Sequence, residues 1–328
     1  MWLTGMIILI VKLILIMGVL LFLASYLIWI ERKFLARLQV RYGPNRAGKF
    51  GLLQPIADAV KLLVKEDIVP AQADRMLFLL APVVVAVTAL LIFAVVPIGA
   101  DLTFRGRSIP LVVSDLNIGL LFAFALSSLS VYGIAVGGWA SNSKYSLLGG
   151  IRGAAQMISY ELALGLSIVP VVMLAGSFSL VDIVNAQAKW PYILVQPVSM
   201  LIFLISAMAE SKRIPFDLPE AENELGAGYH TEYSGMRFGL FFLGEYVQMQ
   251  VLGALLAVLF LGGWRGPFLP PVVWMMIKIM LVAVFMVWVR GTLPRLRYDQ
   301  LMVLGWKVLV PLALVNIVAT GAVMLFLQ

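Results

Sequence analysis

Residues 76–100 read MLFLLAPVVVAVTALLIFAVVPIGA, a run of 25 residues without one charged side chain. The hydrocarbon core of a bilayer is about 30 Å thick, and a helix of about 20 apolar residues crosses it. A strand of a membrane β-barrel is only about 10 residues long and alternates in polarity, which this run does not do. The stretch therefore predicts a membrane-spanning helix.

Seven further segments follow the same pattern. Four of them, at 13–30, 116–143, 190–209 and 308–328, also carry no charge. The other three enclose a single charge each: Glu161 in 153–180, Glu245 in 238–264 and Lys278 in 266–289. We therefore expect an all-α polytopic membrane protein with eight transmembrane helices, in which residues 1–328 form one integral membrane domain.

The composition excludes other classes of protein. Apolar residues make up 62% of the chain and charged residues 12%, whereas soluble domains average about 45–50% and about 25%. A disordered chain would need low hydrophobicity and high net charge. The absence of cysteine and the single histidine, His230, exclude thiolate-held clusters and His-rich metal sites in this chain. We expect no metal site.

The positive charges predict how the chain lies in the membrane. Of the 24 Lys and Arg residues, 18 fall in the loops after the odd-numbered spans and 4 in the loops after the even-numbered ones. Basic loops face the cytoplasm, so both termini are expected on the periplasmic side. The segments 31–75 and 210–237 become long cytoplasmic loops. This distribution also explains the net charge of +7 by contact with membrane lipid and without nucleic acid. The first helix is expected to be retained rather than cleaved as a signal.

The first long loop contains a second type of helix. After the turn at Gly43-Pro44-Asn45, residues Leu52, Ile56, Val60 and Leu63 recur at helical spacing, with charged residues on the opposite face. This pattern predicts an amphipathic helix in the plane of the membrane interface. It fits either a basic loop that contacts anionic lipid or a helix that forms one wall of a lateral opening.

The second long loop is cytoplasmic by topology, yet it is acidic. Asp217 and Glu220 have the spacing of a capping box, which predicts a short helix from Asp217 to about Leu225. Three interpretations stay open: a solvated helix cap, a divalent-cation site, or carboxylates folded inward. Carboxylates held together away from water raise one another's pKa, so the third interpretation predicts a group that passes protons.

The charges inside the spans support the same idea. Ionisable groups at membrane depth are costly and mark ion or proton paths, which makes Glu161, Glu245 and Lys278 candidates for a relay. A structural interpretation is also open, in which Glu245 and Lys278 form a buried pair between neighbouring helices.

Several long motifs give the chain a resemblance to a known family. They are ERK at 31–33, QVRYGPN at 39–45, GLLQPIADAVK at 51–61, GWASNSKY at 138–145, PFDLPEAENEL at 215–225, GEY at 244–246 and LPRLRYDQ at 293–300. In this order, they make the chain resemble the H subunits of bacterial respiratory complex I, the proton-translocating NADH:quinone oxidoreductase, over essentially its whole length.

The resemblance implies a function. Members of this family form the entrance and binding chamber for ubiquinone or menaquinone with the peripheral arm, and they hold no flavin, haem or iron–sulfur cluster themselves. It implies iron–sulfur subunits of the peripheral arm and small and antiporter-like membrane subunits as partners, in the bacterial inner membrane. Carried over by motif, the residues of the quinone path are Glu31, Arg32, Arg41, Phe238, Phe242 and Arg290. The proton relay would comprise Glu161, Glu210, Asp217, Glu220, Glu222, Glu224, Glu232 and Glu245, to which we add Lys278.

Two alternatives use the same residues. A stand-alone cation/proton transporter would move ions without quinone. A related hydrogenase-type complex, or one with another electron donor, would share this type of membrane protein and differ in its partner chains.

Overall fold

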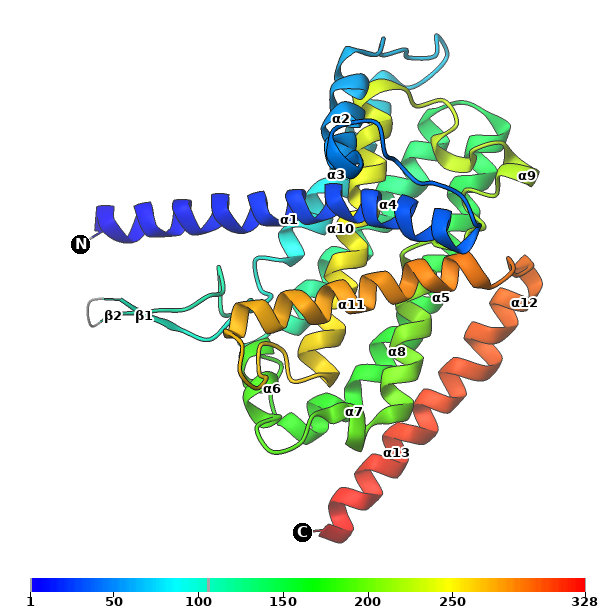
Figure 1. The fold of residues 1–328 in the computed structure, drawn as a ribbon. Coiled ribbons are helices and arrows are strands. Elements are labelled where there is room, and N and C mark those ends of the chain that lie inside the picture. Colours follow the sequence, from blue (N-terminus) through cyan, green and yellow to red (C-terminus); the bar gives the residue numbers. More distant parts are fainter. Residues whose placement is uncertain (1, 105–106, 328) are drawn as a thin grey trace.

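The computed structural model describes residues 2–104 and 107–327, and a few side chains within these ranges, that of Glu222 among them, lie outside the described part. Helices dominate, with one small antiparallel hairpin (Figure 1). The elements are α1 (Trp2–Leu38), η1 (Lys49–Gly51), α2 (Gln54–Val64), α3 (Arg75–Ile92), β1 (Leu102–Phe104), β2 (Arg107–Ile109), α4 (Gly119–Ala140), α5 (Lys144–Ala175), α6 (Leu180–Ala186), α7 (Tyr192–Val195), α8 (Pro197–Glu210), α9 (Glu222–Leu225), η2 (Gly228–His230), α10 (Gly235–Phe260), α11 (Pro271–Thr292), α12 (Tyr298–Val303), η3 (Leu304–Leu309) and α13 (Val310–Leu327).

Seven helices among the described residues are long and apolar enough to cross a membrane, which makes the chain a helical multi-pass membrane protein. They are α1, α3, α4, α5, α10, α11 and the continuous helix formed by α12, η3 and α13. The segment predicted as the fifth span, 190–209, is instead divided into α7 and α8. The division falls at Gln196, directly before Pro197, because proline lacks the N–H that would continue the first helix.

The long helix α10 is the centre of the bundle. Its residues are buried from Phe241 onward almost without interruption, and it packs against α1, α3 and α11. Figure 1 shows α1 (blue) and α11 (orange) crossing α10 (yellow), while α13 (red) runs away from the centre. The outer helices expose large apolar side chains such as Ile14 and Val315, as expected for surfaces that face lipid or other membrane subunits.

The amphipathic helix predicted in the first long loop is confirmed as α2. Its apolar residues Ile56, Val60 and Leu63 are 56%, 53% and 66% exposed. The helix contacts α1 and α10, so these side chains form an apolar face on the outside of the bundle beside the first half of α10.

The predicted helix from Asp217 to Leu225 is wrong. Only α9 is helical, and its N-cap residue is Ala221 without a side-chain cap. The carboxylate of Asp217 pairs with Arg295 instead of capping a helix. Phe216 and Leu218 are buried, and this burial draws the segment before α9 into the bundle in a non-helical form.

Two glycines let the acidic loop pack tightly on α5. A side chain at Gly149 would place its Cβ 2.5 Å from the backbone nitrogen of Tyr229, so only glycine allows this approach. Gly228 has a φ of +60°, and a Cβ there would collide with the carbonyl group of Pro219. The loop thereby folds back on itself and delivers the Tyr229 side chain to the interior.

Candidate functional site

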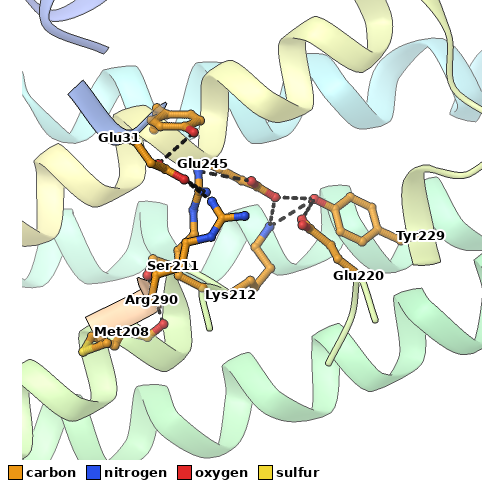
Figure 2. Close-up of polar contacts among 10 residues, drawn as sticks. Glu31, Met208, Ser211, Lys212, Glu220, Tyr229, Glu245 and Arg290 are labelled. Atoms are coloured by element: carbon orange, nitrogen blue, oxygen red, sulfur yellow. Dashed lines mark hydrogen bonds and ion pairs between the residues drawn. The ribbon is translucent and has the colours of Figure 1, made fainter. Parts of the chain in front are cut away.

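Glu245 is at the centre of a buried cluster of charged side chains. It projects from the first half of α10 and is 4% exposed. Its carboxylate lies 3.7 Å from the Lys212 ammonium and 3.8 Å from the Arg213 guanidinium. The hydroxyl of Tyr229 donates to it at 2.9 Å (Figure 2). Because an unpaired charge is very costly away from water, Glu245 requires these partners.

Arg213 joins Glu245 to a second acid. Its Nη1 lies 3.3 Å from Oε1 of Glu31, on α1. Glu31 is 4% exposed and also pairs with Arg290 from the end of α11. The hydroxyl of Tyr246 donates to the other oxygen of Glu31 at 2.9 Å. The predicted quinone-path residues Glu31 and Arg290 are therefore in contact, and one guanidinium links them to Glu245 (Figure 2).

Glu220 completes the cluster from the acidic loop. Its carboxyl group lies 3.3 Å from the hydroxyl of Tyr229, which also lies 2.9 Å from the carboxylate of Glu245. Burial raises the pKa of Glu220 well above its usual value, and the charge of Glu245 raises it further. Burial and the same charge also raise the pKa of Tyr229, so both groups favour their protonated forms more strongly than they would in water.

Asp217 forms an ion pair with Arg295, outside the cluster around Glu245. Its carboxylate accepts a hydrogen bond from Arg295 at 2.8 Å. Burial raises the pKa of Asp217, and Arg295 opposes that shift. The charges of Glu245 and Arg290 also act on this carboxyl group. The protonation of Asp217 therefore depends on the charge at Glu245 and on the charge at Arg290.

Glu210, the last residue of α8, lies on the other side of a small cavity from this cluster. It is 2% exposed and accepts hydrogen bonds from Ser127 and, at 3.0 Å, from Gln248. The cavity is lined by Glu210, Lys212 and Glu245, and the volume open to water is about 10 Å³. That is close to the space that one water molecule needs.

Glu161 is more exposed than Glu210. It is half-buried on α5 and accepts a hydrogen bond from Ser128. It lines two open hollows, of about 450 Å³ and about 360 Å³, whose other walls are almost entirely apolar.

An aromatic row leads along α10 toward Glu31. The rings of Phe238 and Phe242 stack with centroids 5.8 Å apart, and Phe242 contacts Tyr246 at 5.0 Å. This row brings together the two predicted phenylalanines with the tyrosine that binds Glu31. Arg32 and Arg41 lie farther out: Arg32 pairs with Asp58 of α2 at 2.7 Å, and the exposed Arg41 binds Gln39.

The structure does not bring every predicted relay residue into this cluster. Glu224 pairs with Arg152 and its side chain is 55% exposed. Glu232 is half-buried and joins none of the ion pairs among the described residues. The side chain of Glu222 lies outside the described part. Within that part, no three acidic or histidine side chains gather as metal ligands would.

The alternative of a Glu245–Lys278 pair is wrong. Lys278 donates to the carbonyl groups of Leu261, Gly263 and Arg265 at 2.6–2.7 Å. A helix rises about 1.5 Å per residue, so Leu261 lies roughly 24 Å along the axis from Glu245. The ammonium binds the backbone beyond the end of α10 because carbonyls there lack partners in the helix.

Sequence reasoning misses several members of the cluster. By pattern alone, Lys212 and Arg213 are loop charges that set the topology, and Tyr229 and Tyr246 are apolar residues. The adjacent basic pair at 212–213, between a span and an acidic loop, is the available signal. Nothing in the sequence pattern singles out Ser127, Ser128 or Gln248, because isolated polar residues are common in long membrane helices.

Comparison with known proteins identifies the family. A sequence model described as NADH dehydrogenase matches residues 11–321. The chain is 76% identical over 326 residues to the second of the NADH-quinone oxidoreductase H subunits of Syntrophobacter fumaroxidans, covering 99% of this chain and 98% of that one. It is 63% identical to the H subunit of Syntrophotalea carbinolica, with 97% and 96% covered, and 65% identical to the second H subunit of Geobacter sulfurreducens, with 96% of each covered.

The chain belongs to the family of NADH-quinone oxidoreductase H subunits, which are membrane components of complex I. It is thus one component of an enzyme complex, with other complex I subunits as partners, and not an enzyme active alone. This membership confirms the resemblance carried by the motifs at 39–45 and 215–225.

Proposed function

We propose that this protein forms the entrance and binding chamber for quinone with the peripheral arm, and that it couples quinone reduction to proton translocation. The single observation that carries the proposal is the position of Arg213. This buried guanidinium contacts Glu31, which pairs with Arg290, and it also contacts Glu245, which shares the hydroxyl of Tyr229 with Glu220. One residue therefore connects the expected quinone path to the expected proton relay.

The quinone path uses three features of the bundle. The aromatic row at Phe238, Phe242 and Tyr246 offers ring faces to a quinone headgroup, and α2 presents its exposed apolar face beside the same half of α10. Arg290 supplies positive charge, which favours reduced, anionic forms of the headgroup. An isoprenoid tail would remain along apolar surface that is continuous with lipid.

The proton relay begins where the path ends. A negative charge on the headgroup acts first on the Arg290–Glu31 pair, and Arg213 transmits the change to Glu245. Any change in the charge of Glu245 alters the proton affinity of Glu220, which lies at the same Tyr229 hydroxyl. From there the proposed path passes Glu210 across the small cavity and reaches Glu161. The acidic loop is expected on the cytoplasmic side of the bacterial inner membrane, with both termini on the periplasmic side.

Photolabelling of the assembled complex tests the chamber. A photoreactive quinone should label the peptides around residues 238–246 and 31–41, and an excess of unmodified quinone should abolish that labelling. The exposed face of α13 serves as the internal control, because it lies away from the expected path. Labelling confined to α13, or labelling that unmodified quinone does not compete, would contradict the proposed chamber.

A further inference from the structure

Two adjacent serines of α4 hold carboxylates on two different helices. Ser127 binds Oε1 of Glu210, at the end of α8, and Ser128 binds Oε1 of Glu161, on α5. The other serines near them behave differently. Ser130 of α4 and Ser167 of α5 donate only to carbonyls of their own helices, at 2.7 Å and 2.6 Å. Of these four hydroxyls, the two that face carboxylates are thus consecutive in the sequence.

Ser127 fixes one oxygen of Glu210. Its Oγ accepts a hydrogen bond from Gln248 at 3.1 Å, so its single proton is directed to the carboxylate. Gln248 also donates to the same oxygen of Glu210. The other oxygen, Oε2, is buried and has no hydrogen-bond partner among the described residues. The two donors therefore hold Oε1 and leave Oε2 as the oxygen available to the cavity shared with Glu245.

Ser128 fits both protonation states of Glu161. Its Oγ lies within bonding distance of two acceptors, Glu161 and the carbonyl of Phe124, the latter at 3.0 Å. A hydroxyl group has one proton. When Glu161 is ionised, that proton is donated to its carboxylate. When Glu161 is protonated, its carboxyl donates to Oγ, and the hydroxyl turns its proton to Phe124.

We propose that Ser127 and Ser128 are positioning residues that make α4 a hydroxyl bridge between Glu210 and Glu161. Ser127 sets the orientation of the acid beside the buried cluster. Ser128 holds the outer acid at the two hollows and adapts its own proton to the charge of that acid. This inference rests on the proposed relay, and it assigns to α4 the step between the cavity and the outer surface of the bundle.

The charged groups around Glu210 and Glu161 influence the pH dependence of proton transfer between these two acids. Three charged groups act on Glu210. They are Glu161 on α5, Lys212 in the loop after α8, and Glu245, which lines the same cavity. The hollow beside Glu161 is partly walled by Trp306 of η3, an element that also carries Lys307. Removing the serine hydroxyl that donates to either carboxylate disfavours the ionised form of that acid. The bridge therefore predicts that the pH midpoint of proton pumping moves to higher pH in such a variant.

The test uses the assembled complex in membrane vesicles and measures protons moved per quinone reduced across the neutral pH range. Ser127→Ala and Ser128→Ala should each move the pH midpoint of pumping to higher pH by about one unit, since a hydrogen bond to a charged group is worth about tenfold in an equilibrium. Ser128→Thr keeps the hydroxyl and should restore the wild-type midpoint. Ser167→Ala removes a buried hydroxyl that donates to a backbone carbonyl and to no carboxylate among the described residues, so its profile should equal wild type.

Wild-type pumping and an unchanged midpoint in the Ser127→Ala and Ser128→Ala double variant would overturn the bridge. If Glu161→Gln in the same experiment loses pumping, the relay stands and only the role of the serines fails. If Glu161→Gln pumps normally as well, the relay itself fails. Should an alanine variant not assemble, the threonine variants at both positions decide: a wild-type midpoint supports the bridge, and loss of pumping in the assembled threonine variants overturns it.

Discussion

The two halves of α10 have positive charge beside them that is bound in different ways. In its first half, Lys212 and Arg213 face the carboxylate of Glu245. Beyond its last turn, Lys278 faces three backbone carbonyls. A carboxylate gains and loses a proton, whereas a carbonyl keeps the same partial charge at every pH. Only the first arrangement therefore has partner groups that change their charge by gaining or losing a proton.

This difference separates a functional cluster from a structural one. The cations around Glu245 also reach Glu31 and Tyr229, so a change at one acid alters the field at the next. The Lys278 ammonium acts within one segment, where it satisfies carbonyls that a helix end leaves unpaired. We therefore expect variants at the two ends to affect different observables, with the largest loss of turnover at Arg213 and none at Lys278.

Arg213→Met should have the largest effect. It removes the cation shared by Glu31 and Glu245, and breaking a buried ion pair costs about 3–5 kcal/mol. We expect lower heat stability of the complex and loss of most quinone reductase activity in the fraction that assembles. Arg152→Met is the matched control, because its partner Glu224 is exposed and such pairs are worth about 0–1 kcal/mol. Equal effects of the two variants would contradict the central place of Arg213.

Asp217→Asn with Glu220→Gln should leave assembly intact and lower quinone reductase activity by roughly tenfold, the effect of removing interactions worth about 1.4 kcal/mol. The pH dependence has a definite sign. Burial raises the pKa of both groups in the folded protein, so their contribution to stability is present at low pH and is lost as the pH rises through the raised pKa. Heat denaturation at alkaline pH should therefore harm the double variant less than wild type. Wild-type turnover in the assembled double variant would count against the relay.

Arg290→Ala should reduce activity with short-chain and long-chain quinones alike. The guanidinium pairs with Glu31 and supplies charge to the headgroup, which both substrates share. A loss of roughly tenfold or more is expected from the removal of one charged hydrogen bond worth about 1.5–3 kcal/mol. The measurement compares the turnover number of the variant with that of wild type for each of the two quinones. A selective loss with long-tailed quinone would place Arg290 on the path of the tail.

Lys278→Met should affect stability and leave turnover alone. The variant leaves three carbonyls without the ammonium, so the complex should denature at a lower temperature. Turnover per assembled complex and its pH profile should match wild type. A changed pH profile would return Lys278 to the relay and would remove the distinction between the two ends of α10.

The sequence predicts the transmembrane character well because long uncharged runs have one physical solution in a bilayer. Its motifs also single out Glu31, Arg290, Glu220 and Glu245, which the fold brings into one cluster. Prediction fails where the outcome depends on three-dimensional partners. The capping-box spacing at Asp217 does not reveal that Arg295, distant in the sequence, binds that carboxylate. Likewise, two intramembrane charges of opposite sign suggest a pair, but the fold gives Glu245 and Lys278 separate partners.

Redox-induced infrared difference spectroscopy of the assembled complex tests the coupling of quinone charge to the buried acids most directly. Reduction of bound quinone should change a protonated-carboxyl band, because the proton affinity of Glu220 depends on the charge of Glu245, which Arg213 contacts. The band change should disappear in Glu220→Gln and persist in Glu224→Gln, whose carboxylate is exposed. A wild-type spectrum without any carboxyl change on quinone reduction, in a complex that turns over normally, would contradict the coupling.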